Sequence, residues 1–351
     1  MTRICILPQV SGVGGMVSFR AKFAAGLNTR GIEITPHASR FTLHAPRSTH
    51  PDAILIIGGT RDLPGLWRAK RRGVRIVQRL DGMNWLHRQR HTGVKHYLRS
   101  EYGNWLLQFI RSWLADRIVY QSEFSRSWWQ RVYGPTQVPN TVVHNAVDLN
   151  TYTPNPQSTN YQSTNYQILL VEGSLMGGYE MGLETAVALV ERINSVYSQS
   201  LGGRLVELTV VGRVTESVKR QWNERTEIPL IWAGLVSPDR IPEIDRSAHL
   251  LYSSDINAAC PNAVIEALAC GLPVLAFDTG ALPELVTGDS GRVVPYGSDP
   301  WKLDPPDVTA LAEAAVEILT HQDRFRTAAR ARAEEAFRLD AMVDGYLAAL
   351  M

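Results

Sequence analysis

Short apolar runs alternate with longer amphipathic stretches along the chain, a pattern typical of strands and crossover helices in parallel α/β sheets. The pattern predicts five strands in the first half and six in the second. The runs are RICILP, AILIIGG, RIVQRL, RIVYQ and TVVHN, followed by QILLVEG, LTVVG, LIWAG, HLLYSS, PVLAF and GRVV. Residues 324–351 repeat apolar positions with a helical period, and a break is predicted near 338–340.

A polar segment, TPNPQSTNYQSTNYQ, separates the two sets of strands, and within it the pentamer 158–162 recurs as 163–167. Its two prolines and its low apolar content are typical of a linker. A chain of 351 residues also exceeds what a single hydrophobic core normally supports. We therefore predict a first domain over 1–150, a linker over 151–167, a second domain over 168–335 and a final helix over 336–351.

Composition indicates a soluble globular protein, with 44% hydrophobic and 20% charged residues. The opening MTRICILPQVSGVGG does not resemble a signal peptide, and no uninterrupted apolar run is long enough to span a bilayer. The three cysteines, Cys5, Cys260 and Cys270, lack metal-ligand spacing, so reduced thiols are expected. We expect a cytoplasmic protein.

Charge is divided unevenly along the chain. Residues 1–150 hold 21 Lys/Arg against 8 Asp/Glu, whereas the remainder holds 15 against 26. Within 68–99 the only acid is Asp81. This basic segment is either a solvated cationic surface or the contact for an anionic partner, such as a phosphorylated acceptor or lipid head groups at the inner face of the membrane. Nucleic acid is not expected, because no aromatic-interleaved or helix-turn-helix pattern accompanies the charge.

A first candidate site is the glycine turn PQVSGVGGMVSF, in which Gly12, Gly14 and Gly15 precede a predicted helix. Glycine allows close approach of a ligand, and the helix start offers free N–H groups to an anion. A dinucleotide-binding fingerprint would need a third glycine where Val17 stands. The alternative is a tight turn that merely packs a helix on the sheet.

A second candidate site follows the run HLLYSS, where DINAACPN leads into a helix beginning near Pro261 or Asn262. Proline suits the first helical turn and asparagine can cap it. The amides of Asn262, Ala263 and Val264 would favour an anion such as a diphosphate. Glu266 falls one turn later, where its carboxylate could accept hydrogen bonds from ribose hydroxyls. The alternative is an ordinary strand–helix unit with a surface glutamate.

The block CPNAVIEALACGLPVLAFDTGALPELV resembles the retaining glycosyltransferases with the GT-B fold, in the group called family 4. GVGG, DRIVYQSEFSRSWW and VVHNAVDLNTYTP extend the resemblance over nearly the whole chain. It implies two Rossmann-like domains with parallel sheets facing a central cleft, and a final helix that crosses back to the first domain. The implied activity is transfer from a nucleotide-sugar donor to an unidentified acceptor, anionic or lipid-linked, without a metal. A catalytically impaired binding protein on the same fold and a sugar-nucleotide epimerase are the alternatives.

The chain departs from the family pattern at three positions. The first acid of the usual pair is Ala258, and Asp255 is the nearest replacement. Ser174 and Met181 stand where the family carries the arginine and lysine that neutralise the diphosphate. Cations stabilise the charge that builds on a departing phosphate, so their loss would slow transfer. Arg213, at the end of a neighbouring strand, is the candidate substitute.

In the first domain, Asp81 follows RIVQRL, where the family tends to place a residue beside the acceptor. It could orient an acceptor hydroxyl or assist loss of its proton, or it could pair with Arg79 or cap a turn. His87, His91 and His96 lie four and five positions apart on a possible helix. No metalloprotease-type motif accompanies them, so we expect surface histidines and no metal site.

Overall fold

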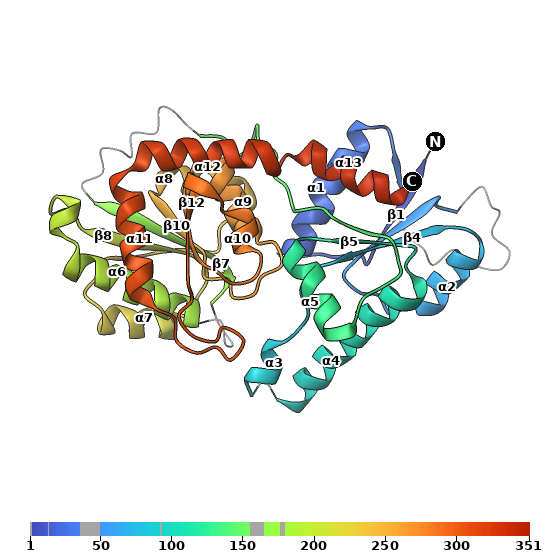
Figure 1. The fold of residues 1–351 in the computed structure, drawn as a ribbon, viewed down its shortest axis with the longest axis horizontal. Helices are drawn as coiled ribbons and strands as arrows, with labels where there is room; N and C mark the ends of the chain where they lie inside the picture. The colour runs from blue at the N-terminus through green and yellow to red at the C-terminus, as the bar shows by residue number, and fades with distance from the viewer. Residues whose placement is uncertain (1, 13, 36–49, 92, 155–164, 176–179) are drawn as a thin grey trace. The chain divides into compact units, whose positions relative to one another are not determined.

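The computed structural model describes residues 2–12, 14–35, 50–91, 93–154, 165–175 and 180–351. The chain forms two compact units, one made of residues 1–145 with 339–351 and the other of residues 146–338. Each unit is built around one six-stranded parallel sheet (Figure 1). Most of the predicted linker, residues 155–164, lies outside the described residues.

The sheet of the first unit has the strand order β2-β1-β3-β4-β5-β6, and every pair is parallel. Its strands are β1 (Arg3–Leu7), β2 (Glu33–Thr35), β3 (Ala53–Ile57), β4 (Arg75–Leu80), β5 (Arg117–Tyr120) and β6 (Asn140–Val142). The helices are α1 (Gly15–Thr29), α2 (Leu63–Arg71), α3 (Leu86–Gln89), α4 (Val94–Phe109), the π-helical turn η3 (Ile110–Leu114), α5 (Glu123–Tyr133) and α13 (Leu339–Leu350). β3 is buried along its whole length, as expected of a central parallel strand.

The C-terminal helix α13 belongs to the first unit. Tyr346 is fully buried, and its ring lies 4.9 Å from that of Phe19 and 5.5 Å from that of Phe23, both on α1. Aromatic rings at such separations pack favourably beyond the area they bury. The chain therefore leaves the first unit at residue 145 and returns to complete its core at residue 339.

The sheet of the second unit has the order β12-β11-β10-β7-β8-β9, again all parallel. Its strands are β7 (Tyr166–Ser174), β8 (Val206–Arg213), β9 (Leu230–Gly234), β10 (Leu250–Tyr252), β11 (Val274–Phe277) and β12 (Gly291–Val294). The longer helices are α6 (Met181–Val196), α7 (Glu216–Arg225), α8 (Ile241–Ser247), α9 (Asn262–Ala269), α11 (Val308–Thr320) and α12 (Gln322–Ala336). The shorter turns are η5 (Gln199–Leu201), η6 (Pro238–Arg240), α10 (Leu282–Leu285) and η7 (Gly288–Ser290). The strand order reverses between β7 and β10, which makes their carboxyl ends the natural place for a ligand.

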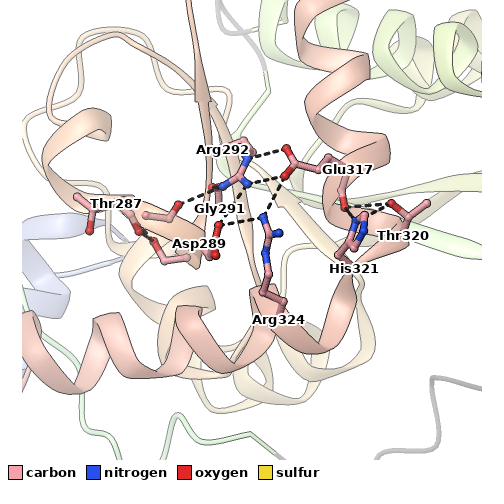
Figure 2. Close-up of polar contacts among 10 residues, drawn as sticks. Thr287, Asp289, Gly291, Arg292, Glu317, Thr320, His321 and Arg324 are labelled. Carbon is pink, nitrogen blue, oxygen red and sulfur yellow. Dashed lines mark hydrogen bonds and ion pairs between the residues drawn. The ribbon is translucent and has the colours of Figure 1, made fainter.

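An ionic network ties the last helices of the second unit to its edge strand (Figure 2). Arg292 of β12 donates to Glu317 of α11 through Nε at 2.7 Å and also donates to Asp289 of η7 at 3.2 Å. Arg324 of α12 donates to both of these carboxylates at 3.0 Å. This network lies at the β12 edge of the sheet. Strands β11 and β10 separate it from β7.

All eleven predicted strands are present, and the structure adds β2, a short strand that pairs with β1 at the edge of its sheet. The predicted break near the C-terminus is confirmed, because α12 ends at Ala336 and α13 begins at Leu339. In the described part of the chain, no helix has both the length and the apolar character needed to cross a membrane.

Candidate functional site

The carboxyl edge of the second sheet places Ser174 and Arg213 side by side. They are the last residues of β7 and β8 and are register partners, and Leu175 N donates to the carbonyl oxygen of Arg213 at 3.0 Å. The Arg213 side chain is exposed. A guanidinium is thus available on the strand next to the position where the resemblance implies an arginine. Met181, where it implies a lysine, is the first residue of α6.

Helix α9 begins directly after the loop from β10, with Pro261 at its N-cap and Asn262 as its first residue. The predicted helix start is confirmed, but the expectation that Asn262 caps it is wrong, because in the described structure no side chain makes a capping bond there. The first amides, around Asn262, Ala263 and Val264, are therefore without a side-chain cap. Such a helix start favours an anion, because the N–H groups and the helix dipole both present positive charge.

The loop before α9 is held against the turn that follows β11. Thr279 Oγ1 donates to the carbonyl oxygen of Asp255 at 3.3 Å, and Asn257 N donates to Thr279 Oγ1 at 3.5 Å. Ala281 N donates to the carbonyl oxygen of Ala258 at 2.9 Å. These bonds fix the backbone of Ala258, whose methyl group cannot accept the hydrogen bonds that an acid would accept.

Two acids flank the point where the strand order reverses. Glu172 lies on β7, Asp255 follows β10, and Ser254 Oγ donates a short hydrogen bond to Glu172. Burial raises the pKa of both carboxyls, and the charge of Asp255 raises the pKa of Glu172 further. Burial therefore favours the protonated form of these carboxyls, and the pKa of Glu172 is raised to about 8. The sequence prediction missed Glu172; its only local signal is an acid near the end of the apolar run QILLVEG.

Glu266 lies one turn into α9 and is half-buried rather than on an open surface. Its charge raises the pKa of the buried Asp245 of α8, although burial is the larger cause, and it likewise adds to the raised pKa of Tyr152. Burial and the charge of Glu266 therefore both favour the protonated form of Asp245.

In the first unit, Asp81 follows β4 and is anchored through its backbone. Its carbonyl oxygen accepts hydrogen bonds from Ser125 Oγ at 2.8 Å and Trp129 Nε1 at 2.7 Å, both from α5. Burial raises the pKa of the Asp81 carboxyl, and the nearby charge of Arg79 opposes that rise. The Arg79 guanidinium itself donates to Asn145 Oδ1 at 2.9 Å. The backbone of Asp81 is thus held in place, and burial favours the neutral form of its carboxyl.

The glycine turn of the first unit forms the start of α1, with Gly14 at the N-cap and Gly15 as the first residue. Ser18 N donates to the carbonyl oxygen of Gly14 at 3.0 Å. A Cβ built on Gly14 would meet no described atom within 4 Å, so the space above this turn is open. The turn follows β1. In this sheet β1 lies between β2 and β3, so the strand order reverses at β1. Val13 lies outside the described residues.

The histidines of the basic segment are only partly where the sequence predicted them. His91 and His96 are exposed, but His87 is buried and its Nε2 hydrogen-bonds with Glu101 Oε1 at 2.8 Å, so the surface prediction is wrong for His87. Arg88 holds the same carboxylate at 2.6 Å and lowers the pKa of Glu101 to about 2. Over the described residues, no group of three or more His, Cys, Asp or Glu side chains is arranged to hold a metal ion.

The two sheets and the arrangement at their carboxyl edges define a GT-B fold. Sucrose-phosphate synthase from Thermosynechococcus elongatus matches with a TM-score of 0.73 and 16% identity, covering 99% of this chain and 98% of that one. Anabaena HepE in complex with UDP and glucose matches at 0.68 and 16%, covering 100% and 99%. WaaG, a glycosyltransferase involved in lipopolysaccharide biosynthesis, matches at 0.67 and 13%, covering 98% of each chain.

Residues 168–321 match the family described as glycosyl transferases group 1. Among curated protein sequences, none matches the chain significantly. The chain thus has the fold of the GT-B glycosyltransferase structures, and its residues 168–321 are similar to the glycosyl transferases group 1 family.

Proposed function

We propose that the protein transfers a sugar from a UDP-sugar to an acceptor hydroxyl, with retention at the anomeric carbon. Support for a uridine nucleotide comes from HepE, which has been crystallised with UDP and with UDP-glucose. The observation that carries the proposal is the carboxyl edge of the second sheet, where β10, β7 and β8 lie in that order: α9 with Glu266 follows β10, and Arg213 ends β8.

The diphosphate is the group that this edge is best suited to hold. As the glycosidic bond breaks, negative charge builds on the leaving phosphate, and the amides of Asn262 to Val264 face it with the positive end of α9. Arg213 supplies the side-chain cation, next to Ser174, whose hydroxyl donates a hydrogen bond. Glu266 accepts hydrogen bonds from the ribose hydroxyls. This stabilisation comes from the helix and the guanidinium, so the proposed reaction requires no metal ion.

Glu172 and Asp255 lie near the proposed diphosphate site, and two ionised carboxylates would repel a diphosphate. Because burial raises the pKa of Glu172 and of Asp255, the pair keeps a proton and carries less negative charge than two free acids. The carboxyl groups of Glu172 and Asp255 can also make hydrogen bonds to sugar hydroxyls. In our proposal this pair takes over the recognition that Ala258 cannot provide.

The acceptor is assigned to the first unit. Asp81 would orient the acceptor hydroxyl, and the open turn at Gly14 and Gly15 would receive the rest of the acceptor. In a front-face reaction the departing phosphate oxygen takes the acceptor's proton, so Asp81 need not act as a dedicated base. The basic charge of this unit suits an anionic acceptor or one presented at a membrane surface.

The test is a transfer assay over a panel of UDP-, GDP- and ADP-sugars, with nucleotide release and the anomeric configuration of the product followed by NMR. Glu266→Ala should weaken UDP binding about 10- to 100-fold, because it removes charged hydrogen bonds. Arg213→Ala should lower kcat about 100-fold while changing affinity less. The exposed Glu224→Ala and Arg220→Ala, both on α7, are the matched controls and should leave both quantities unchanged.

Two outcomes would contradict the proposal in different ways. UDP binding by calorimetry without turnover of any donor would indicate a catalytically impaired binding protein on the same fold. Equal UDP affinity in the parent protein and in Glu266→Ala would mean that the nucleotide lies elsewhere.

A further inference from the structure

Helix α4 carries apolar side chains on its solvent side. Val94, Leu98, Tyr102 and Trp105 recur at intervals of four, four and three residues, so they share one face of the helix. Their exposed fractions are 77%, 62%, 45% and 50%. The face of a helix that points to water normally carries polar and charged residues, so this stripe needs an explanation.

Two further exposed tryptophans lie on neighbouring elements of the same unit. Trp113 of η3, which continues α4, is 71% exposed, and Trp67 of α2, which packs against η3, is 51% exposed. Within the stripe, the rings of Tyr102 and Trp105 stack with centroids 5.9 Å apart. We call the set of Trp67, Val94, Leu98, Tyr102, Trp105 and Trp113 the aromatic face. Figure 1 shows α4 running as one straight helix along the border of the first unit.

Cations accompany the aromatic face. Lys95 and Arg99 are exposed on α4, beside the stripe. The Arg61 guanidinium lies 5.9 Å from the ring centroid of Tyr102, and that of Arg71 lies 4.5 Å from the ring centroid of Trp67. Arginines held over aromatic rings in this way keep their charge next to apolar surface.

The acids of the same elements are already engaged. Asp62 caps α2 by accepting from Gly65 N at 2.9 Å. Glu101 is held by Arg88 at 2.6 Å, and Asp116 accepts from Lys70 at 2.6 Å. The aromatic face is therefore bordered by positive charge that these carboxylates do not neutralise.

We propose that the aromatic face docks on the surface of an anionic phospholipid bilayer. Tryptophan and tyrosine favour the interface between lipid head groups and acyl chains. An amphipathic helix with basic residues beside an apolar stripe lies in the plane of that interface. Each lysine or arginine near an anionic surface strengthens the attachment. A second copy of the chain is a poorer partner, because two cationic surfaces of the same kind repel one another.

Vesicle flotation tests the docking independently of enzymatic activity and therefore of the proposed transfer reaction. The full-length protein is mixed with vesicles of phosphatidylcholine alone or of phosphatidylcholine with phosphatidylglycerol. It should float with the anionic vesicles only, release at high salt, and show a blue shift of tryptophan emission on binding. Absence of a preference for phosphatidylglycerol would overturn the proposal.

Matched variants locate the contact. Lys95→Glu with Arg99→Glu should weaken binding to the anionic vesicles at least about 30-fold. Arg192→Glu with Arg220→Glu, which reverses two exposed arginines of the second unit, should leave binding unchanged. Equal losses in the two double variants would mean that net charge alone, rather than this face, governs binding.

A second pair of variants tests how much the apolar side chains of the aromatic face contribute to vesicle binding. Leu98→Ser should weaken vesicle binding about tenfold or more, whereas Leu205→Ser, at a leucine of the second unit that is 47% exposed, should not. Circular dichroism and the melting temperature report that each variant is folded. A dimer in light scattering that Leu98→Ser dissociates, without vesicle binding by the parent protein, would assign the face to a second copy instead.

Discussion

Gly280 lies in the turn after β11 that supports the loop leading into α9. Its φ is +62°, and a Cβ added there would lie 2.6 Å from both the backbone N and the carbonyl oxygen of Ala258. These are backbone atoms, so they cannot rotate away as a side chain can. Gly280→Ala must therefore displace the loop that positions the first amides of α9.

Gly280→Ala should lower the free energy of unfolding for two reasons, and a second glycine allows them to be measured separately. An alanine in the left-handed region costs about 1–2 kcal/mol, and forcing a packed backbone to move adds about 1–3 kcal/mol. Gly288 has a φ of +58°, but a Cβ added there would meet nothing described within 4 Å. Gly288→Ala therefore carries only the first part, whereas Gly280→Ala carries both and should lower the free energy of unfolding by about 2–5 kcal/mol.

Urea unfolding followed by circular dichroism measures the stability of both variants, and calorimetry measures their affinity for UDP. Gly280→Ala should be less stable than Gly288→Ala and should bind UDP more weakly, while Gly288→Ala should bind UDP as the parent protein does. Equal stability and equal UDP affinity in the two alanine variants would refute the reasoning, because they would show that the loop before α9 adjusts freely.

Three further changes test other parts of the structure. Arg292→Met should lower the free energy of unfolding by about 1–2 kcal/mol in urea, because it removes charged hydrogen bonds to Glu317 in a partly exposed site. Burial raises the folded-state pKa of Glu172, so stability present at acidic pH is lost as the pH rises above the ordinary glutamate value of about 4.3. Glu172→Gln should flatten that decline in melting temperature, and an unchanged profile would contradict the assignment. Tyr346→Ala should destabilise the first unit by about 3–5 kcal/mol, and a smaller loss would mean that α13 contributes little to its core.

Most of the fold could be predicted because parallel strands buried on both faces are continuous apolar runs. β3 shows this most simply, since AILII is buried at every position. β2 was missed because its three residues, Glu33 to Thr35, are partly exposed at the edge of the sheet. A short edge strand buries little apolar surface, so its sequence need not contain the apolar run that predicts a strand.

The candidate site was predictable only where its signal is local. Pro261 and Asn262 after an apolar run are enough to predict the start of a helix. The contact between Glu172 and Ser254 joins residues 82 positions apart, and it depends on β7 lying next to β10. The strand order of the sheet, rather than any motif, brings Glu172 and Ser254 together.

The histidines show a different limit of sequence patterns. Spacing placed His87, His91 and His96 on a possible helix, where exposure is the usual expectation. The structure breaks that segment into α3 and α4, and Glu101 of α4 reaches back to the buried His87. Burial of a polar side chain depends on how helices pack together. The intervals between the three histidines in the sequence do not predict this packing.

Net charge is a poor guide to where this chain holds an anion. The proposed diphosphate site lies on the unit whose sequence is rich in acids, whereas the basic excess belongs to the other unit. We infer that the local field decides, because the carboxyl edge of the second sheet carries an exposed arginine and a helix start without a side-chain cap, while burial raises the pKa of the nearby Glu172 to about 8. A charge reversal at Arg213 should therefore weaken UDP binding far more than the same reversal at Arg220, although both change the net charge equally. Equal effects would show that the field of the whole unit, and not this edge, attracts the nucleotide.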